Sequence, residues 1–240
     1  MSIFRRKKKV EQPLCAAVIA AAGSSTRMGE DKIMLALDGE PVIVHTIRAL
    51  ERCSQISEIV IVTREALLVP LAQLCKDYSF TKVSKIIRGG ASRTESVFLG
   101  VSEVSCDPKL IAIHDGARPF VSPKVVEDAV AQAERTGAAV PALPVKDTIK
   151  QAADGLVERT VDRSVLYAVQ TPQVFDADLI RAALKKAMED KAEITDDCSA
   201  VERLGMKVTL TAGSEENFKL TTRGDLLLAQ ALLWMRRGNL

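Results

Sequence analysis

The chain has 240 residues, and its 33 lysines and arginines are nearly balanced by 31 aspartates and glutamates. This balance excludes the concentrated positive charge that binding to a nucleic acid backbone requires, and 4% aromatic residues are too few for a base-stacking surface. A chain of this length is typical of one domain and allows two. It contains no run of about 18 apolar residues, so we expect no membrane-spanning helix.

The first residues carry an uneven share of the charge. Residues 1–12 contain five lysines and arginines and one glutamate, so the remainder of the chain is slightly acidic. A run of like charges at a terminus is typical of a solvated, disordered end, and no apolar segment of the kind found in secretory signals follows it. We therefore expect a disordered basic tail over residues 1–13 and a single domain over residues 14–240.

The five cysteines are widely spaced, and no two of them form a CxxC pair. An odd number at such spacing argues against both a disulfide framework and a zinc site. Cysteines that stay reduced, in a chain without a secretory signal, predict a cytoplasmic protein.

Short apolar runs alternate along the chain with amphipathic stretches of helical length. This pattern predicts an α/β protein in which helices flank a Rossmann-like, mostly parallel sheet. In chain order, we expect a strand over 15–22, a helix over 41–53, strands over 59–63 and 82–88, a helix that starts at the capping motif of Ser92 and Glu95, a strand over 110–114, a helix over 123–135, strands over 138–144 and 165–169, helices over 177–190 and 195–204, a strand over 207–211 and a last helix from residue 223.

Residues 146–163 break this alternation. The segment is polar, has no apolar helical face, and carries the turn pair Asp154 and Gly155 between β-prone flanks. We interpret it as a β-hairpin arm that projects from the sheet. Because an isolated hairpin cannot bury enough surface to be stable alone, we expect the arm to pack against a second subunit, which makes the protein a homodimer.

A loop of small residues directly follows the first expected strand. Gly23 and its neighbours let the backbone approach a ligand and direct N–H groups toward phosphates, while Arg27 and Lys32 add positive charge. The spacing between Gly23 and Gly29 does not match a P-loop, and the loop lacks the dinucleotide fingerprint G-x-G-x-x-G. The loop therefore indicates a phosphate-binding site that is neither a P-loop nor a dinucleotide-binding loop.

Two further loops are expected at the same edge of the sheet, because ligands of open α/β sheets bind where the strands end. One of them contains Asp115, which follows a buried apolar strand, and Arg118. The other contains Gly90, Arg93 and Ser96. An aspartate in such a place can hold Mg²⁺ while substrate phosphates complete the coordination of the ion. The three loops together predict a metal–phosphate site.

Eight short motifs occur in the order A-A-G-x-x-x-R-M-G…K, G-G-x-x-R-x-x-S-V, H-D-x-A-R-P, P-V-x-D-T, T-V-D-R, T-P-Q, I-T-D-[DE] and N-x-K-[LV]-T. In these motifs the chain resembles the 2-C-methyl-D-erythritol 4-phosphate cytidylyltransferases of the non-mevalonate isoprenoid pathway, over about residues 15–236. Two positions depart from the family pattern: Gly116, where the family often has alanine, and Asp31, where it often has proline. Both changes leave the charged groups in place.

The resemblance implies an enzyme that transfers CMP from CTP to 2-C-methyl-D-erythritol 4-phosphate, and that uses Mg²⁺ or another divalent cation. It implies that the metal binds Asp115. The implied CTP-binding residues are Ala21, Ala22, Gly23, Arg27, Lys32, Gly90, Ala91, Ser96 and Gly116. The implied residues for the polyol phosphate acceptor are Arg118, Thr148, Arg163, Thr171, Thr195 and Lys219, with Thr148 and Arg163 of the arm reaching into the site of the partner subunit.

The chemistry of this transfer requires positioning and charge stabilisation. A phosphate oxygen of the acceptor attacks the α-phosphorus of CTP, and because that oxygen is already an anion, no side-chain nucleophile or base is needed. Lys32 and Lys219, together with Arg27, are therefore the catalytic candidates. His114 is interpreted as a packing or hydrogen-bonding residue, and His45 as a partly buried structural one.

Three other activities fit part of the pattern. CTP-dependent transfer to ribitol 5-phosphate would use the same anion-holding groups. A sugar-1-phosphate nucleotidyltransferase that uses another nucleotide is disfavoured by the motifs after residue 145. A nucleotide-binding module without activity is disfavoured because Arg27, Lys32, Asp115 and Lys219 are all present.

Overall fold

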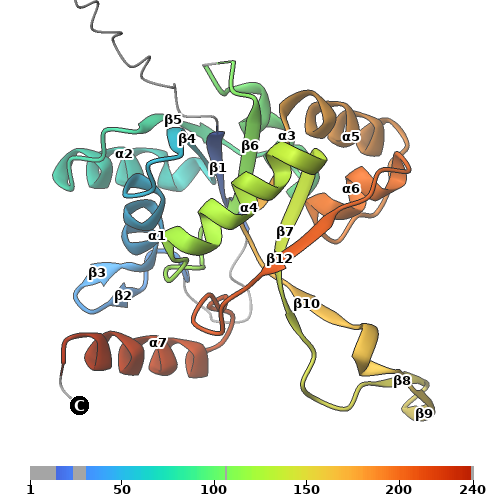
Figure 1. Ribbon diagram of the computed structural model, residues 1–240. Coiled ribbons are helices and arrows are strands. Elements are labelled where there is room, and N and C mark those ends of the chain that lie inside the picture. Colours follow the sequence, from blue (N-terminus) through green and yellow to red (C-terminus); the bar gives the residue numbers. More distant parts are fainter. Residues whose placement is uncertain (1–14, 24–30, 106, 239–240) are drawn as a thin grey trace, which may run out of the picture.

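The computed structural model describes residues 15–23, 31–105 and 107–238. The expected basic tail over residues 1–13 lies outside this part of the chain, and so does Arg27. An eight-stranded sheet forms the centre, in the order β10-β7-β11-β6-β1-β4-β5, with β12 paired to β7 (Figure 1). Its strands are β1 (Cys15–Ala21), β4 (Ile56–Thr63), β5 (Val83–Arg88), β6 (Leu110–Asp115), β7 (Ala138–Pro144), β10 (Tyr167–Val169), β11 (Gln173–Asp176) and β12 (Thr209–Ala212).

Helices lie on both sides of this sheet (Figure 1). They are α1 (Val42–Glu51), α2 (Leu68–Asp77), α3 (Arg93–Ser102), α4 (Pro123–Thr136), α5 (Ala177–Glu189), α6 (Asp197–Arg203) and α7 (Arg223–Arg236). Two small two-stranded ribbons, β2 (Ala36–Leu37) with β3 (Glu40–Pro41) and β8 (Lys150–Ala153) with β9 (Leu156–Thr160), complete the fold. None of the helices in the described ranges is both long enough and apolar enough to cross a bilayer.

The predicted fold class is confirmed. The pairs β1–β4, β1–β6, β4–β5 and β7–β12 are parallel, whereas β10 and β11 pair antiparallel to their neighbours. The sequence patterns do not reveal β11, because Gln173 and Asp176 leave it an apolar run of only two residues. They also miss α2, in which Leu71 is the one buried side chain, and they place a strand over 165–169 where a 3₁₀ turn (Arg163–Val165) precedes a shorter β10.

The packing of β1 explains its uninterrupted apolar sequence. Ala17 and Ile19 contribute to a core cluster with α1 and α4, whereas Val18 contributes to a second cluster with α3 and α5. Because β4 and β6 flank the strand and helices cover both faces, every position is apolar instead of every second one. Because β1, β4, β5 and β6 are parallel to one another, they all end at the same edge of the sheet.

Gly100 of α3 packs closely against the sheet. A Cβ atom at this position would lie 2.5 Å from Val18 and 2.5 Å from Val62. We expect Gly100→Ala to lower the free energy of unfolding by about 1–3 kcal/mol, because the side chains of β1 and β4 would have to move. Gly224→Ala in α7 is the matched control: its nearest atom would be 3.6 Å away, so the higher helix propensity of alanine should stabilise the protein by up to about 1 kcal/mol. Urea unfolding of the two variants tests the contrast, and equal effects would contradict it.

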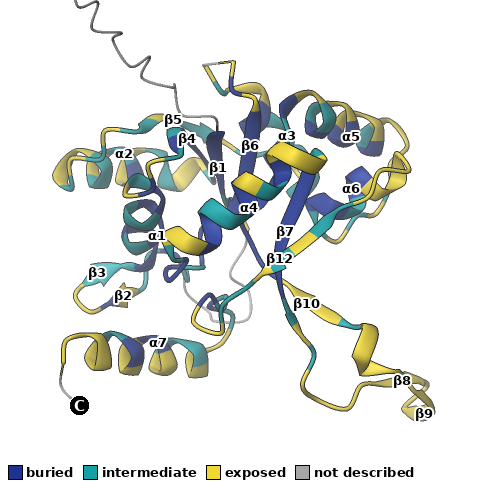
Figure 2. Cartoon of the chain, viewed as in Figure 1, coloured by how far each residue is buried: buried dark blue, intermediate teal, exposed yellow. Residues whose placement is uncertain are grey.

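The arm is a β-hairpin that extends away from the sheet, as predicted, and its residues are exposed (Figure 2). Asp154 and Gly155 have φ angles of 50° and 78°, which are the left-handed values that a tight hairpin turn requires. Leu156 and Val157 are 74% and 62% exposed. The hairpin thus presents apolar side chains that its own chain does not cover.

Candidate functional site

A cavity of about 440 Å³ lies at the edge where β1, β5 and β6 end. The three loops that follow these strands line it together, as expected from the shared direction of parallel strands. The predicted CTP-binding residues that line it are Ala21, Ala22, Gly23, Lys32, Gly90, Ala91, Ser96 and Gly116, and Asp115 and Lys219 line it as well. Lys219 comes from the segment between β12 and α7. This segment does not follow β1, β5 or β6, so the rule that ligands bind where the strands end does not predict its place in the cavity.

The loop before α3 is held by the first turn of that helix. Ser96 Oγ accepts a hydrogen bond from the Gly90 N–H (3.1 Å) and donates one to the Ser92 carbonyl (2.8 Å), and Glu95 accepts from the Ala91 N–H (2.7 Å). Ser92 caps the helix as predicted, but Glu95 binds the amide of Ala91 instead of the amide of Ser92. A Cβ at Gly90 would lie 2.3 Å from the Glu95 side chain, so a larger residue at this position would displace Glu95 from the Ala91 amide.

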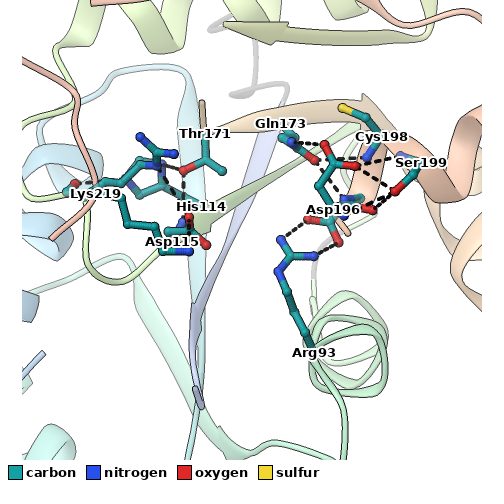
Figure 3. A network of polar contacts seen from close by, with 11 residues as sticks. Arg93, His114, Asp115, Thr171, Gln173, Asp196, Cys198, Ser199 and Lys219 are labelled. Carbon is teal, nitrogen blue, oxygen red and sulfur yellow. Dashed lines mark hydrogen bonds and ion pairs between the residues drawn. The ribbon is translucent and has the colours of Figure 1, made fainter. Parts of the chain in front are cut away.

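Asp115 is the charged centre of the site. Its Oδ2 lies 2.9 Å from Lys219 Nζ and 3.5 Å from Arg118 Nε, and only 11% of its side chain is exposed (Figure 3). Burial alone would raise the pKa of Asp115, but the charge and hydrogen bond of Lys219, followed by the charge of Arg118, lower it to about 2. The carboxylate is therefore ionised at any pH near neutral.

The predicted acceptor residues divide into two groups. Arg118 and Thr171 lie against Asp115: Arg118 through the ion pair, and Thr171 through its Oγ1, which accepts a hydrogen bond from the Asp115 N–H (3.1 Å). Thr195 is exposed just before α6. Thr148 and Arg163 are exposed on the arm and do not line the cavity of their own chain; Arg163 Nη1 donates to the Lys146 carbonyl at 2.5 Å.

A second polar network adjoins the cavity through Arg93, which we expected from the sequence to be a cation of the metal–phosphate site. Arg93 makes two hydrogen bonds, of 2.9 and 2.6 Å, to the fully buried carboxylate of Asp197. Gln173 accepts from the Asp197 N–H (3.0 Å) and donates to Asp196 (2.8 Å) (Figure 3). This network ties the start of α3 to the start of α6. Its signals in the sequence are the G-G-x-x-R-x-x-S-V, T-P-Q and I-T-D-[DE] motifs, which contain Arg93, Gln173 and the two aspartates.

The donor set of the cavity can be tested against a divalent cation. Within residues 15–23, 31–105 and 107–238, no three His, Cys, Asp or Glu side chains form a cluster that could hold a metal ion by themselves. Asp115 supplies one carboxylate to the cavity. A single carboxylate is a pattern that fits Mg²⁺ carried by substrate phosphates, since Mg²⁺ keeps waters and takes few protein ligands.

Comparisons with known proteins test the family resemblance of the sequence motifs. The sequence profile of one family, described as "IspD: 2-C-methyl-D-erythritol 4-phosphate cytidylyltransferase", matches residues 15–235. A protein named 2-C-methyl-D-erythritol 4-phosphate cytidylyltransferase from Halalkalibacterium halodurans is 45% identical over 218 residues, which cover 90% of this chain and 95% of that protein.

Solved structures match the fold over more than nine-tenths of the chain. The 4-diphosphocytidyl-2C-methyl-D-erythritol synthase of Anaerococcus prevotii superimposes with a TM-score of 0.83 at 29% identity, covering 93% of this chain and 99% of that one. The 2-C-methyl-D-erythritol 4-phosphate cytidylyltransferase of Thermus thermophilus gives a TM-score of 0.77 at 33% identity, with 91% and 98% covered.

Proposed function

The chain belongs to the 2-C-methyl-D-erythritol 4-phosphate cytidylyltransferase family, and on that basis we propose that it transfers CMP from CTP to 2-C-methyl-D-erythritol 4-phosphate. The products are 4-diphosphocytidyl-2-C-methyl-D-erythritol and pyrophosphate, so the enzyme is a nucleotidyltransferase of isoprenoid precursor synthesis. The observation that carries this proposal is the cavity in which Lys32, Lys219 and Asp115 meet a wall of glycine and alanine residues.

The transfer forms one bond and breaks one. An oxygen of the acceptor phosphate bonds to the α-phosphorus of CTP, and the bond from that phosphorus to the oxygen that bridges it to the β-phosphate breaks, so that pyrophosphate leaves with the electron pair. Two anions must be held together while negative charge grows on the α-phosphoryl oxygens. Fixed cations directed at that charge are the main source of catalysis in such a reaction. Lys32, Lys219 and Arg27 are proposed for this role.

We assign the small residues of the cavity to CTP. The backbone of Ala21, Ala22 and Gly23 and that of Gly90 and Ala91 can approach a pyrimidine ring closely, which larger side chains would prevent. Ser96 and Gly116 complete this proposed nucleotide wall. Arg118, Thr171, Thr195 and Lys219 are proposed for the acceptor, and Thr148 and Arg163 for the acceptor bound in a partner subunit.

Asp115 is the proposed ligand for Mg²⁺ or another divalent cation, which would neutralise charge on the triphosphate when it is bound. The chain's own contribution is to keep this carboxylate ionised. The proximity of Lys219 and Arg118 does so, because both lower the pKa of Asp115.

Release of pyrophosphate tests the proposed function. With Mg²⁺, CTP and 2-C-methyl-D-erythritol 4-phosphate, we expect release that the other three nucleoside triphosphates do not support. The same assay with ribitol 5-phosphate tests the alternative acceptor, and a higher kcat/KM for ribitol 5-phosphate would favour it. Absence of release with either acceptor would favour a nucleotide-binding module without activity.

We also propose that the protein is a homodimer through the arm, with Arg163 acting in the site of the partner. The support is the exposed apolar surface of the hairpin and the position of Arg163 away from the cavity of its own chain. Arg163→Ala and Lys32→Ala should each be nearly inactive alone. When the two variants are mixed and exchange subunits, half of the dimers contain one subunit of each variant. Each of these mixed dimers has one site with no substitution. Activity should therefore return to about a quarter of that of the parent.

The same mixture of variants can also contradict the proposal that Arg163 acts in the site of the partner. If Arg163 acts in its own chain, every site of a mixed dimer keeps one defect, and mixing restores nothing. Deletion of residues 150–158 should in addition halve the mass in solution. A dimer that persists with full activity after this deletion would remove the arm from the interface.

A cytoplasmic location is proposed on the chemistry of the cysteines. Cys53, Cys75 and Cys198 are free thiols, and burial raises the pKa values of all three. Unreactive, unpaired thiols are typical of proteins of reducing compartments.

A further inference from the structure

The turn that carries Lys32 has an acidic residue at its start. It spans residues 31–35, and the Asp31 carbonyl accepts hydrogen bonds from the N–H groups of Met34 (2.8 Å) and Leu35 (3.1 Å). Lys32 lines the cavity, and Asp31 does not. The family resemblance assigns no role to Asp31, because the family often has proline at this position. The contacts of its carboxylate therefore need a separate explanation.

Core packing fixes the part of the turn that follows Lys32. Ile33 is buried in a core cluster, and its carbonyl accepts a hydrogen bond from the Ile43 N–H (2.9 Å). The Leu35 carbonyl accepts one from the Val42 N–H (3.0 Å). Val42 and Ile43 form the start of α1 and are themselves fully buried. The residues after Lys32 are thus held to α1 by burial and by backbone hydrogen bonds.

An ion pair fixes the residue that precedes Lys32. The Asp31 carboxylate binds the guanidinium group of Arg64, which directly follows β4. The end of β4 is itself fixed, because Thr63 pairs with β1 and its carbonyl accepts a hydrogen bond from the Gly89 N–H (2.8 Å). Only 20% of the Asp31 side chain is exposed, against 40% for Arg64. Arg64 therefore ties the start of the turn to the edge of the sheet.

We propose that Asp31 and Arg64 are positioning residues for Lys32, and that neither of them contacts a substrate. Arg64 does not line the cavity, although the loops after the two neighbouring strands, β1 and β5, both do. A lysine side chain is long and flexible, so its ammonium group stabilises a developing charge best when the backbone that carries it is held in place. The role rests on the proposed function only through the catalytic role of Lys32.

The pair also determines the charge next to Lys32. Without a cation beside it, the Asp31 carboxylate would repel the triphosphate that Lys32 attracts. The guanidinium group of Arg64 neutralises this carboxylate. We therefore expect Arg64→Ala to lower the rate of the transfer more than Asp31→Ala does. Addition of Asp31→Ala to the Arg64→Ala protein should recover part of the loss, because it removes the uncompensated charge.

The first test measures amide hydrogen exchange and needs no activity. The amides of Met34 and Leu35 donate to the Asp31 carbonyl, so their exchange shows whether the turn is held. Asp31→Ala and Arg64→Ala should each speed this exchange about threefold to fivefold, which is the equilibrium effect of one partly exposed ion pair, and the double variant should add nothing more. Glu65→Ala, which breaks an exposed ion pair one residue further along the chain, is the matched control and should leave the exchange unchanged. Unchanged exchange in Asp31→Ala or Arg64→Ala would overturn the proposal.

The second test uses release of pyrophosphate and separates positioning from substrate contact. Asp31→Ala should lower kcat about fivefold. In the Lys32→Ala protein the same substitution should cause no further loss, because Asp31 acts through Lys32. Arg64→Lys, which keeps the cation, should retain most of the parent rate, and Glu65→Ala should retain all of it.

Two results of this assay contradict the positioning role. One is a further loss when Asp31→Ala is added to Lys32→Ala, because Asp31 would then act independently of Lys32. The other is a lower KM for CTP in Asp31→Ala, because Arg64 would then be a substrate-binding cation that Asp31 masks. If the parent releases no pyrophosphate, the proposed function fails, and amide exchange alone decides whether the pair holds the turn.

Discussion

Replacement of Lys32 by alanine should lower kcat by a factor of about 10²–10³ or more, with the fold intact. Lys32 lies in the turn before β2 and lines the cavity. It is not part of the hydrophobic core, so its replacement should not disturb the fold. Its ammonium group would lie against the triphosphate, where negative charge increases during the transfer. Loss of one such charge-stabilising group typically has an effect of this size. Steady-state rates of pyrophosphate release measure it.

Two controls distinguish a catalytic effect of Lys32 from a general one. Lys85→Ala removes a lysine of comparable exposure that pairs with Glu103, and Lys85 does not line the cavity, so its rate should stay near that of the parent. Circular dichroism and thermal unfolding should show that Lys32→Ala is folded. If the activity of Lys32→Ala stays within about threefold of the parent, Lys32 has no catalytic role.

Asp115→Asn should reduce kcat by a similar factor of about 10²–10³. The substitution removes the proposed metal ligand, and it also leaves Lys219 and Arg118 without the carboxylate that they contact. Raising the concentration of Mg²⁺ should recover part of the loss if the main defect is weakened metal binding. Asp128→Asn, which breaks an exposed pair with Lys124 on α4, is the matched control and should retain full activity. Near-normal activity of Asp115→Asn would exclude the proposed role.

The pKa of Asp115 makes this substitution a test of stability as well. The pKa in the folded state, about 2, is below the reference value of 3.8, so the folded protein gains stability when Asp115 is ionised. That contribution, about 2 kcal/mol, is fully present above about pH 4 and is lost as the pH falls toward 2. The difference in free energy of unfolding between the parent and Asp115→Asn should therefore be largest near neutral pH. A difference that does not change down to pH 2 would contradict the depressed pKa.

Local sequence patterns predicted an element correctly where burial, capping or turn preference acts on consecutive residues. The continuous apolar run of β1, the serine cap and glycine end of α4, and the Asp154–Gly155 turn each form the predicted element. Patterns were insufficient for β11 and α2. In α2 only Leu71 is buried, and β11 has an apolar run of only two residues although its neighbours β6 and β7 bury three of its four positions.

The sequence by itself determined the α/β class, the hairpin arm and the loops that line the cavity, because all of these depend on residues that are close in the chain. The parallel order of β1, β4, β5 and β6 then brings those loops to one edge of the sheet. Only the tertiary structure decided the position of Lys219 beside Asp115, 104 residues earlier, and the pairing of Arg93 with Asp197. It also decided that the Thr171 hydroxyl faces His114, since a hydrogen bond between side chains distant in the chain depends on how β6 and β11 pair. Hydrogen bonds and pKa values depend on such contacts between distant residues, and these contacts cannot be inferred from the sequence alone.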